Sequence, residues 1–258
     1  MRHFSLALLG LLALAAGTFA QQQQPTGTPA QLTAQLENWE KQMTVVKSLS
    51  ASCTRTDVNK VRNENTVLTG VVKCMKVDAP GGKVEKLALL QLAQKDHPEV
   101  YEKFVCTGNQ LYWFAPREKA IYVKKLGDKV GGDSFLDFLF EMKAPAMQKR
   151  FDMTLVRPED PNYVYIDIKP RLEGDKVEFQ RARLVLFKRD YLPAQLWFEE
   201  PNGNHHTWEL THVTANDPAV KPAEFVAPEK PKGWEIKEVK ETDADTPPRV
   251  IRPSNARP

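Results

Sequence analysis

The stretch TGNQLYWFAPREKAIYVK, residues 107–124, decides how this chain is expected to fold. Turn-forming pairs at 108–109 (Gly-Asn) and 116–117 (Pro-Arg) bound two short runs, 110–115 and 119–124, which are rich in aromatic and β-branched residues. A parallel connection between strands needs about a dozen residues or more. These connections are far shorter, so the sequence predicts antiparallel neighbours.

Nine further segments share this character, and each is bounded by Gly, Pro, Asn or Asp. Eleven strands in succession predict one large antiparallel sheet, which should curl or close toward a barrel rather than stay flat. The nine segments cover residues 49–58, 66–77, 85–95, 100–106, 153–156, 162–169, 177–188, 194–200 and 205–214.

A helix is predicted to precede the first strand. Thr28 is placed to cap it, Pro29 suits its first position, and Gln31 completes a capping box. Apolar residues then recur every three or four positions until about Lys47, which places them on one helical face. These residues are Leu32, Leu36, Trp39, Met43 and Val46.

A second helix is predicted at residues 133–142, between the two sets of strands. Asp133 can cap it, and Pro145 would end it or start another helix that runs to Phe151. Because its apolar residues surround almost the whole helix, it must be buried on more than one side. They are Phe135, Leu136, Phe138, Leu139, Phe140 and Met142.

The two ends of the chain differ from its middle. Residues 1–3 are basic, 4–16 are apolar, and Thr18 and Ala20 suit a cleavage site before Gln21, which is the layout of a secretory signal peptide. The mature protein is therefore expected to be exported. The predicted division is a signal peptide at 1–20, a disordered leader at 21–27, a folded domain at 28–240 and a disordered, proline-rich charged tail at 241–258.

Composition narrows the function. The 258 residues include 36 Lys and Arg against 33 Asp and Glu, without the concentrated basic stripe of a nucleic-acid-binding protein. The three cysteines are Cys53, Cys74 and Cys106. A hairpin turning near residues 63–64 would place Cys53 opposite Cys74, where a disulfide could form if the spacing suits it. The alternative, which we favour, is three buried thiols.

Catalytic and metal-binding motifs are sparse. The sequence has no GxSxG elbow, no Ser-x-x-Lys set and no phosphate-binding glycine loop. His205 and His206 follow a turn and, as strand neighbours, point to opposite faces, so we interpret them as exposed and expect no metal. Glu199 and Glu200 read as solvated charges at a strand end. A binding protein without a cofactor is expected rather than an enzyme.

Several strands are apolar on both faces, for example residues 87–92, 163–166 and 184–187. Both faces of the sheet must then be covered, or one must face a cavity. Helices over a curved sheet could enclose a dry apolar pocket suited to lipid. They could equally fill the interior as a solid core, and the pattern alone leaves both readings open.

The order of motifs resembles the LolA/LolB family of periplasmic lipoprotein carriers over roughly residues 31–234. The helix at 135–142 falls where that family has a lid helix, and the other resembling segments are 68–73, 107–116, 119–123, 168–170, 192–196, 202–204, 208–210 and 225–228. The resemblance implies a mainly β, α+β fold: an incomplete antiparallel β-barrel of about eleven strands closed by lid helices.

The resemblance also implies a function. Such a protein would be a periplasmic monomer that holds the acyl chains of lipoproteins or other lipids. Its partner would be a membrane transporter that hands over the lipid or an acceptor that receives it. The family's lid-holding arginine is replaced in charge by Lys76. The implied lid residues are Trp39, Phe135, Leu136, Phe138 and Leu139, and the implied cavity walls are Tyr112, Phe114, Tyr165 and Trp208.

A second function is compatible with the same fold. Periplasmic stress-sensing proteins that resemble these carriers bind a membrane-protein partner, so the chain could be a non-enzymatic interaction or regulatory module. Lipid that co-purifies with the protein would favour the carrier, and a lipid-free protein that captures a membrane partner would favour the module.

Overall fold

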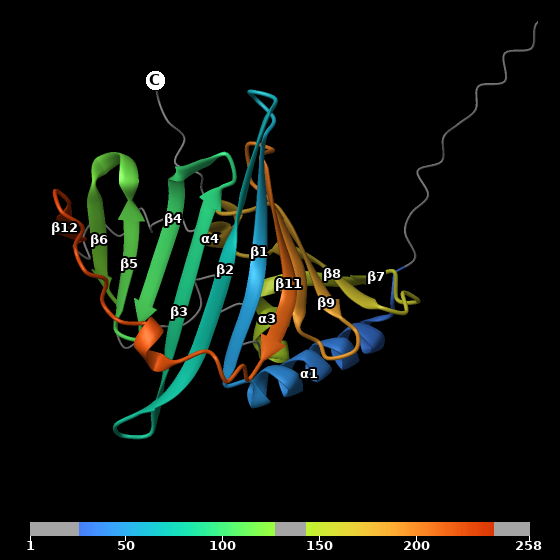
Figure 1. Ribbon diagram of the computed structural model, residues 1–258. Coiled ribbons are helices and arrows are strands. Elements are labelled where there is room, and N and C mark those ends of the chain that lie inside the picture. The colour runs from blue at the N-terminus through green and yellow to red at the C-terminus, as the bar shows by residue number, and fades with distance from the viewer. Residues whose placement is uncertain (1–25, 127–142, 240–258) are drawn as a thin grey trace, which may run out of the picture.

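The computed structural model describes residues 26–126 and 143–239 (Figure 1). Its described residues form a twelve-stranded sheet in the order β12-β6-β5-β4-β3-β2-β1-β11-β10-β9-β8-β7. The strands are β1 Ser48–Asn59, β2 Glu64–Ala79, β3 Lys83–Gln94, β4 His97–Thr107, β5 Gln110–Ala115, β6 Ala120–Lys125, β7 Phe151–Val156, β8 Tyr163–Pro170, β9 Arg181–Phe187, β10 Pro193–Glu199, β11 His205–Ala215 and β12 Glu235–Glu238.

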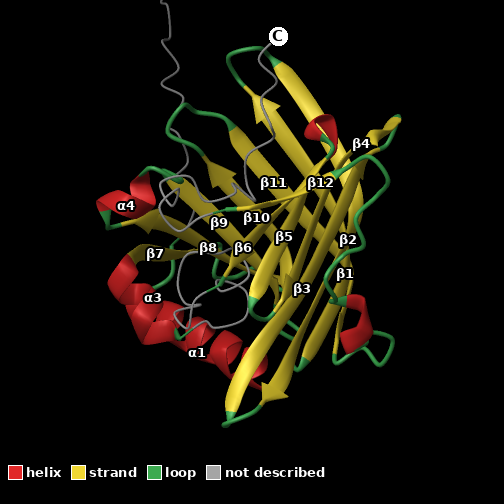
Figure 2. Ribbon diagram, turned by 90° about the vertical axis from the view of Figure 1, so that its left-hand side faces the viewer, coloured by secondary structure: helices red, strands yellow, loops and turns green. Residues whose placement is uncertain are grey.

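The incomplete barrel expected from the sequence is confirmed. The sheet is strongly curved (Figure 2), and its outermost strands, β12 and β7, are not paired with each other. Pairing of β1 with β11 joins the two halves of the chain in one antiparallel sheet. The twelfth strand, β12, was not predicted, and it runs parallel to β6.

The strand predicted at 177–188 begins later than expected. Residues 173–176 form a short helix, α4 (Glu173–Lys176), and the backbone turns again after it. The cause is Asp175, whose carboxylate accepts hydrogen bonds from the guanidinium of Arg150. This anchored turn delays entry into the sheet until Arg181.

Two longer helices lie on the concave side of the sheet (Figure 2). In α1 (Pro29–Val45), Thr28 and Gln31 form the predicted capping box, with hydrogen bonds of 2.8 and 3.3 Å. Helix α3 (Ala144–Arg150) has a proline in its first turn, as expected. The helix predicted at 133–142 lies outside the described residues. Short 3-10 turns, η1 (Pro116–Glu118) and η2 (Pro222–Glu224), complete the helical elements of the part of the chain that the structure describes.

The main core lies between the inner, concave face of the sheet and α1. Strand alternation places Cys53 of β1, Val72 of β2 and Leu92 of β3 on this face, all at most 3% exposed. The five apolar residues predicted for one face of α1 are all buried in the same core. The amphipathic helix therefore covers an apolar sheet, as its spacing indicated.

The outer, convex face of β2–β6 is crossed by the segment that follows β11 (Figure 1). Val220 and Phe225 pack there with Leu87 of β3, and Trp234 packs nearer to β6. At the opposite edge, Gly27 donates a backbone hydrogen bond of 2.8 Å to Leu155 of β7. Segments from both ends of the described chain thus contact the outermost antiparallel strands.

Candidate functional site

The candidate site is the inner face of the curved sheet. Trp39 of α1 and Trp208 of β11 both belong to the core on this face, with exposures of 0% and 2%. Of the nine aromatic and aliphatic residues proposed for the site, these two are described and face inward. Phe135, Leu136, Phe138 and Leu139 lie outside the described residues, so their role stays a prediction.

Three other proposed wall residues face outward. Tyr112 and Phe114 belong to the outer cluster around Ile121. The guanidinium carbon of Arg157 lies 5.2 Å from the ring centre of Tyr165. In β5 the inward position belongs to Trp113, because it pairs with the inward-facing Phe104 of β4. Assigning faces by alternation was therefore wrong by one residue in this strand.

An aromatic group lies on the inner face of β4–β6. Trp113 stacks on Tyr122 of β6, with ring centres 5.1 Å apart and planes 12° apart, and both side chains are half-buried. Phe104, in register with Trp113, is also half-buried and packs on the main core. This group extends the apolar inner face from the buried core of β3 toward the β6 edge.

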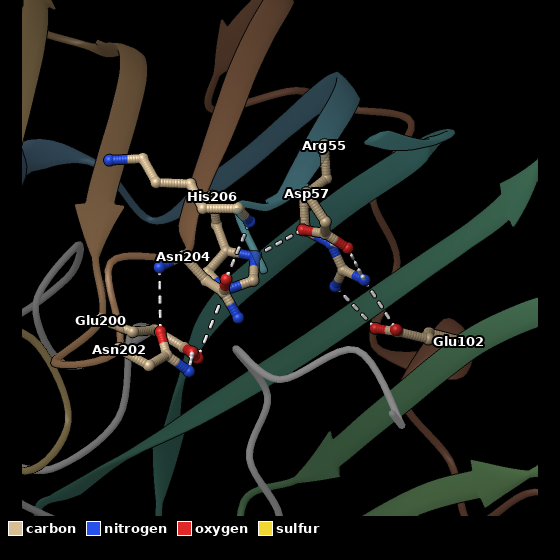
Figure 3. Close-up of polar contacts among 8 residues, drawn as sticks. Arg55, Asp57, Glu102, Glu200, Asn202, Asn204 and His206 are labelled. Carbon is tan, nitrogen blue, oxygen red and sulfur yellow. Dashed lines mark hydrogen bonds and ion pairs between the residues drawn. The ribbon is translucent and has the colours of Figure 1, made fainter. Parts of the chain in front are cut away.

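One end of the inner face carries a buried polar network (Figure 3). Arg55 of β1, with 0% exposure, donates two hydrogen bonds of 2.7 Å to the carboxylate of Glu102 on β4. Its Nε also donates to Asp57 at 3.1 Å, and its guanidinium carbon lies 5.1 Å from the ring centre of Trp208. The network thus joins strands from both halves of the sheet.

The charge of Arg55 is stabilised by these partners. Burial by itself would lower the pKa of its guanidinium, but the hydrogen bonds and negative charges of Glu102 and Asp57 outweigh burial and raise it. Removal of one of these partners would leave part of the buried positive charge uncompensated, which is costly in free energy. Arg55 is therefore a fixed positive group at the polar end of the inner face.

His206 continues the network through a second set of carboxylates. Its Nδ1 lies 2.6 Å from Asp57, and its Nε2 lies 3.4 Å from Glu200 (Figure 3). Burial disfavours the charged ring, but the hydrogen bonds to Asp57 and Glu200 outweigh it and raise the pKa of His206. With a carboxylate facing each ring nitrogen, the imidazolium form fits the site best.

Two surface assignments from the sequence are corrected here. His206 is 2% exposed and Glu200 is 6% exposed, whereas both were expected at the solvent. The turn after β10 explains the difference. Across it the backbone N–H of Glu200 donates to the carbonyl of Asn204, the N–H of Gly203 donates to the carbonyl of Glu200, and the side chain of Asn202 donates to the Glu200 carboxylate at 3.1 Å. The turn folds this carboxylate back over the inner face, toward His206.

Lys76 contacts the C-terminal end of α1, and its role in holding a lid stays a prediction. Its ammonium donates a 2.8 Å hydrogen bond to the backbone carbonyl of Met43, in the last turn of α1. Asn216, at the end of β11, accepts from the backbone of Lys47 at 2.7 Å and donates to the carbonyl of Val45 at 3.3 Å. Together they satisfy carbonyl groups that the end of a helix leaves unpaired.

The three cysteines are buried and form no disulfide. The hairpin turns where predicted, but its register pairs Cys53 with Gly70 and Cys74 with Leu49, so Cys53 does not lie opposite Cys74. Burial raises the pKa of the Cys53 thiol to about 12, against the opposing charge of Arg55. Burial likewise raises the pKa of Cys74. These thiols are unreactive parts of the core, the reading that we favoured.

Sequence reasoning missed Arg55, Glu102 and Trp113. The signal for Arg55 was present, because it continues the alternation of Leu49, Ala51 and Cys53 and so points inward with them. Its partner was not visible, because β2 and β3 separate β1 from β4 in the sheet.

Within residues 26–126 and 143–239, no group of three or more His, Cys, Asp or Glu side chains could hold a metal ion. A pocket of about 320 Å³ lies at one end of β8 and β9 and is lined by Pro161, Asn162, Tyr163, Phe187, Lys188 and Arg189. It differs in place and in polarity from the apolar hollow that the sequence suggested on the inner face.

No protein family model matches this chain, and no curated protein matches it. No helix among the described residues has the length and apolar character to cross a membrane. Similar solved structures include the complex of MucA and MucB from Pseudomonas aeruginosa, with 11% sequence identity, a TM-score of 0.41, and coverage of 76% of this chain and 60% of that chain. This chain thus spans 60% of the length of that chain.

Two further similar structures cover most of both chains. A LolA superfamily protein from Nitrosomonas europaea shares 10% identity at a TM-score of 0.35, with 75% of this chain and 96% of that chain covered. LprF from Mycobacterium bovis shares 13% identity at a TM-score of 0.39, with 77% and 99% covered. The likeness to these structures concerns the fold alone.

Proposed function

We propose that this chain is an exported, non-enzymatic lipid carrier that holds the acyl chain of a lipoprotein or another lipid on the inner face of its half-barrel. The observation that carries this proposal is the aromatic group of Phe104, Trp113 and Tyr122, which remains half-buried beside a fully buried apolar core. Apolar surface that is only partly covered on a concave face suits an apolar ligand.

The energetics of this role are favourable. Each methylene removed from water contributes about 0.8 kcal/mol, so one long acyl chain supplies on the order of 10 kcal/mol before the costs of binding. The acyl chain would extend from the aromatic group toward the core. The network around Arg55 would close the polar end of the inner face. Release requires a part that moves, because such a gain would otherwise make binding nearly permanent.

Helix α1 and the segment at 135–139 are the proposed moving parts. Trp39 on α1 would give way to the acyl chain, while the contacts of Lys76 and Asn216 would keep the C-terminal end of α1 in place as a pivot. The N-terminal half of α1 is held by side-chain hydrogen bonds, among them those of Tyr191 with Gln35 and Asn38. The bond from Asn38 is exposed and the bond to Gln35 is partly buried, and water can replace either partner when the helix moves.

Binding of a fluorescent fatty acid to the full mature chain tests the inner face. The change Trp113→Glu places a charge within the aromatic group and should weaken binding at least about tenfold, because a desolvated charge opposes an acyl chain. The matched control is Trp197→Glu, since Trp197 is a half-buried tryptophan on the outer face of β10, beside His205. Equal losses in both variants would contradict the proposal.

The proposed lid has its own test. Phe138→Asp should abolish fatty-acid binding while the circular dichroism of the folded chain is retained. Unchanged binding would remove residues 135–139 from the mechanism.

Organic extraction of the purified mature protein, followed by mass spectrometry, separates the carrier from the interaction module. Bound lipid supports the carrier, whereas a lipid-free protein that captures a defined membrane-protein partner supports the module.

A further inference from the structure

The chain forms a specific turn just before β12. The backbone N–H of Trp234 donates to the carbonyl of Pro231 at 3.1 Å, and Gly233 between them has a φ of 79°. This is the positive φ that the third residue of a type II turn requires, and glycine adopts it without steric cost. The turn fixes the direction in which Trp234 leaves the segment.

Trp234 is directed onto the outer face of the sheet. Its ring meets that of Phe114 edge-on, with centres 5.9 Å apart. The surrounding apolar cluster is separate from the main core and consists of Leu89, Val105, Tyr112, Ile121 and Val123. The side chain of Trp234 thus anchors the C-terminal segment to this cluster.

Strand β12 itself is attached through its backbone. Glu235 and Val239 donate hydrogen bonds of 2.9 Å to the carbonyls of Lys119 and Val123 on either side of the pairing with β6. All four side chains of β12 are exposed, and Ile236, its only apolar residue, is 51% exposed. Backbone hydrogen bonds of this kind do not depend on the sequence that makes them.

One further contact gives the segment a second point of recognition. The ammonium of Lys237 lies 5.7 Å from the ring centre of Tyr122, the residue with which it is in register on β6. Trp234 and Lys237, three positions apart, therefore contact opposite faces of the same edge, one through aromatic packing and one through a cation–π contact.

We propose that the β6 edge, with the outer cluster beside it, is a binding site for an extended peptide segment of a partner protein, and that residues 234–239 fill this site within the chain. The peptide would add parallel to β6, with an aromatic residue in the place of Trp234 and Lys or Arg three positions later. The chain's own segment shows the chemistry that the site accepts, and it is attached by few side chains, so a competing strand can replace it. The site shares Tyr122 with the aromatic group of the inner face, but peptide binding does not require that this group bind lipid.

The test uses the full mature chain with Trp234→Ala and Glu235→Pro combined. These changes remove the aromatic contact and the first backbone donor to β6, so hydrogen exchange of residues 236–239 should accelerate while the rest of the sheet stays protected. The matched control is Ile236→Ser, which alters an exposed side chain of β12 and keeps its backbone bonds. Its exchange should equal that of the wild type.

A fluorescein-labelled peptide of residues 230–239 is then titrated into each protein. Saturable one-to-one binding is expected for the double variant, with binding at least about tenfold weaker to the wild type and to Ile236→Ser, whose sites are filled. The peptide with Trp234→Ala should bind at least about tenfold more weakly, and with Lys237→Ala about threefold more weakly.

Absence of saturable binding to the opened variant would overturn the proposal. Equal binding to the wild type and the opened variant would overturn it as well, because the peptide would then occupy another surface. Neither result bears on fatty-acid binding, so failure here is distinguishable from failure of the carrier proposal.

Discussion

Arg55 of β1 and Glu102 of β4 form a two-point ion pair, both distances being 2.7 Å, although β2 and β3 lie between their strands. The register explains how the pair can form. Gly70 occupies the row that joins Cys53 to Leu92 and Glu102, so no side chain of β2 stands in that row. The curvature of the sheet and this missing side chain together leave room for the side chains of Arg55 and Glu102 to meet across the inner face.

We expect Glu102→Gln to destabilise the protein by about 2–3 kcal/mol, because it leaves the buried guanidinium of Arg55 with Asp57 as its charged partner. Urea unfolding measures the change. The control is Asp167→Asn, which breaks the half-buried pair with Arg183 near the surface and should cost less than about 1 kcal/mol. Equal costs would show that the buried pair has no special role in stability.

Gly70→Ala is expected to destabilise by about 2–3 kcal/mol, because an added Cβ would lie 1.9 Å from the carbonyl oxygen of Gln91 and force β2 and β3 apart. Gly174→Ala in α4 is the matched control, since no atom lies within 4 Å of the added carbon. It should be neutral or stabilise by up to about 1 kcal/mol. Similar urea midpoints for the two variants would contradict the close approach of the strands.

Stability should depend on pH through His206. Its pKa in the folded protein is raised above the ordinary value of 6.5, so the stabilisation is fully present below that value and is lost as pH rises through the folded pKa. Between pH of about 5.5 and 8.5, the wild type should lose about 1–2 kcal/mol relative to His206→Gln.

The pH measurement needs a histidine outside the network as its control. His97→Gln alters an exposed ring and should leave the pH profile of the wild type unchanged. A wild type that gains stability relative to His206→Gln as pH rises would show that His206 is held neutral in the fold.

Lys76→Met should destabilise by about 1 kcal/mol and accelerate hydrogen exchange in the last turn of α1, because the carbonyl of Met43 loses a charged donor. Lys41→Met, at an exposed position of the same helix, is the control and should leave exchange unchanged. If α1 pivots at this end, Lys76→Met should also speed fatty-acid release. Unaltered exchange would mean that Asn216 alone secures the helix end.

The sequence by itself determined the local elements. Thr28, Pro29 and Gln31 specified where α1 begins through hydrogen bonds within four residues, and short turns required antiparallel neighbours. The eleven strands and their antiparallel neighbours followed from this local information. Strand β12 could not be predicted in the same way, because a four-residue segment with exposed side chains has no alternation to reveal it.

Only the tertiary structure decided which side chains share the inner face. Trp113 lies between two other aromatic residues, and any of the three would satisfy either face of the sheet, so the pairing of Trp113 with Phe104 settles the alternation. Arg55 and Glu102 are 47 residues apart, and they meet because the curved sheet has no side chain at Gly70. Local sequence selects strands and turns, but register and curvature arise from the pairing of distant segments, and these two features build the candidate site.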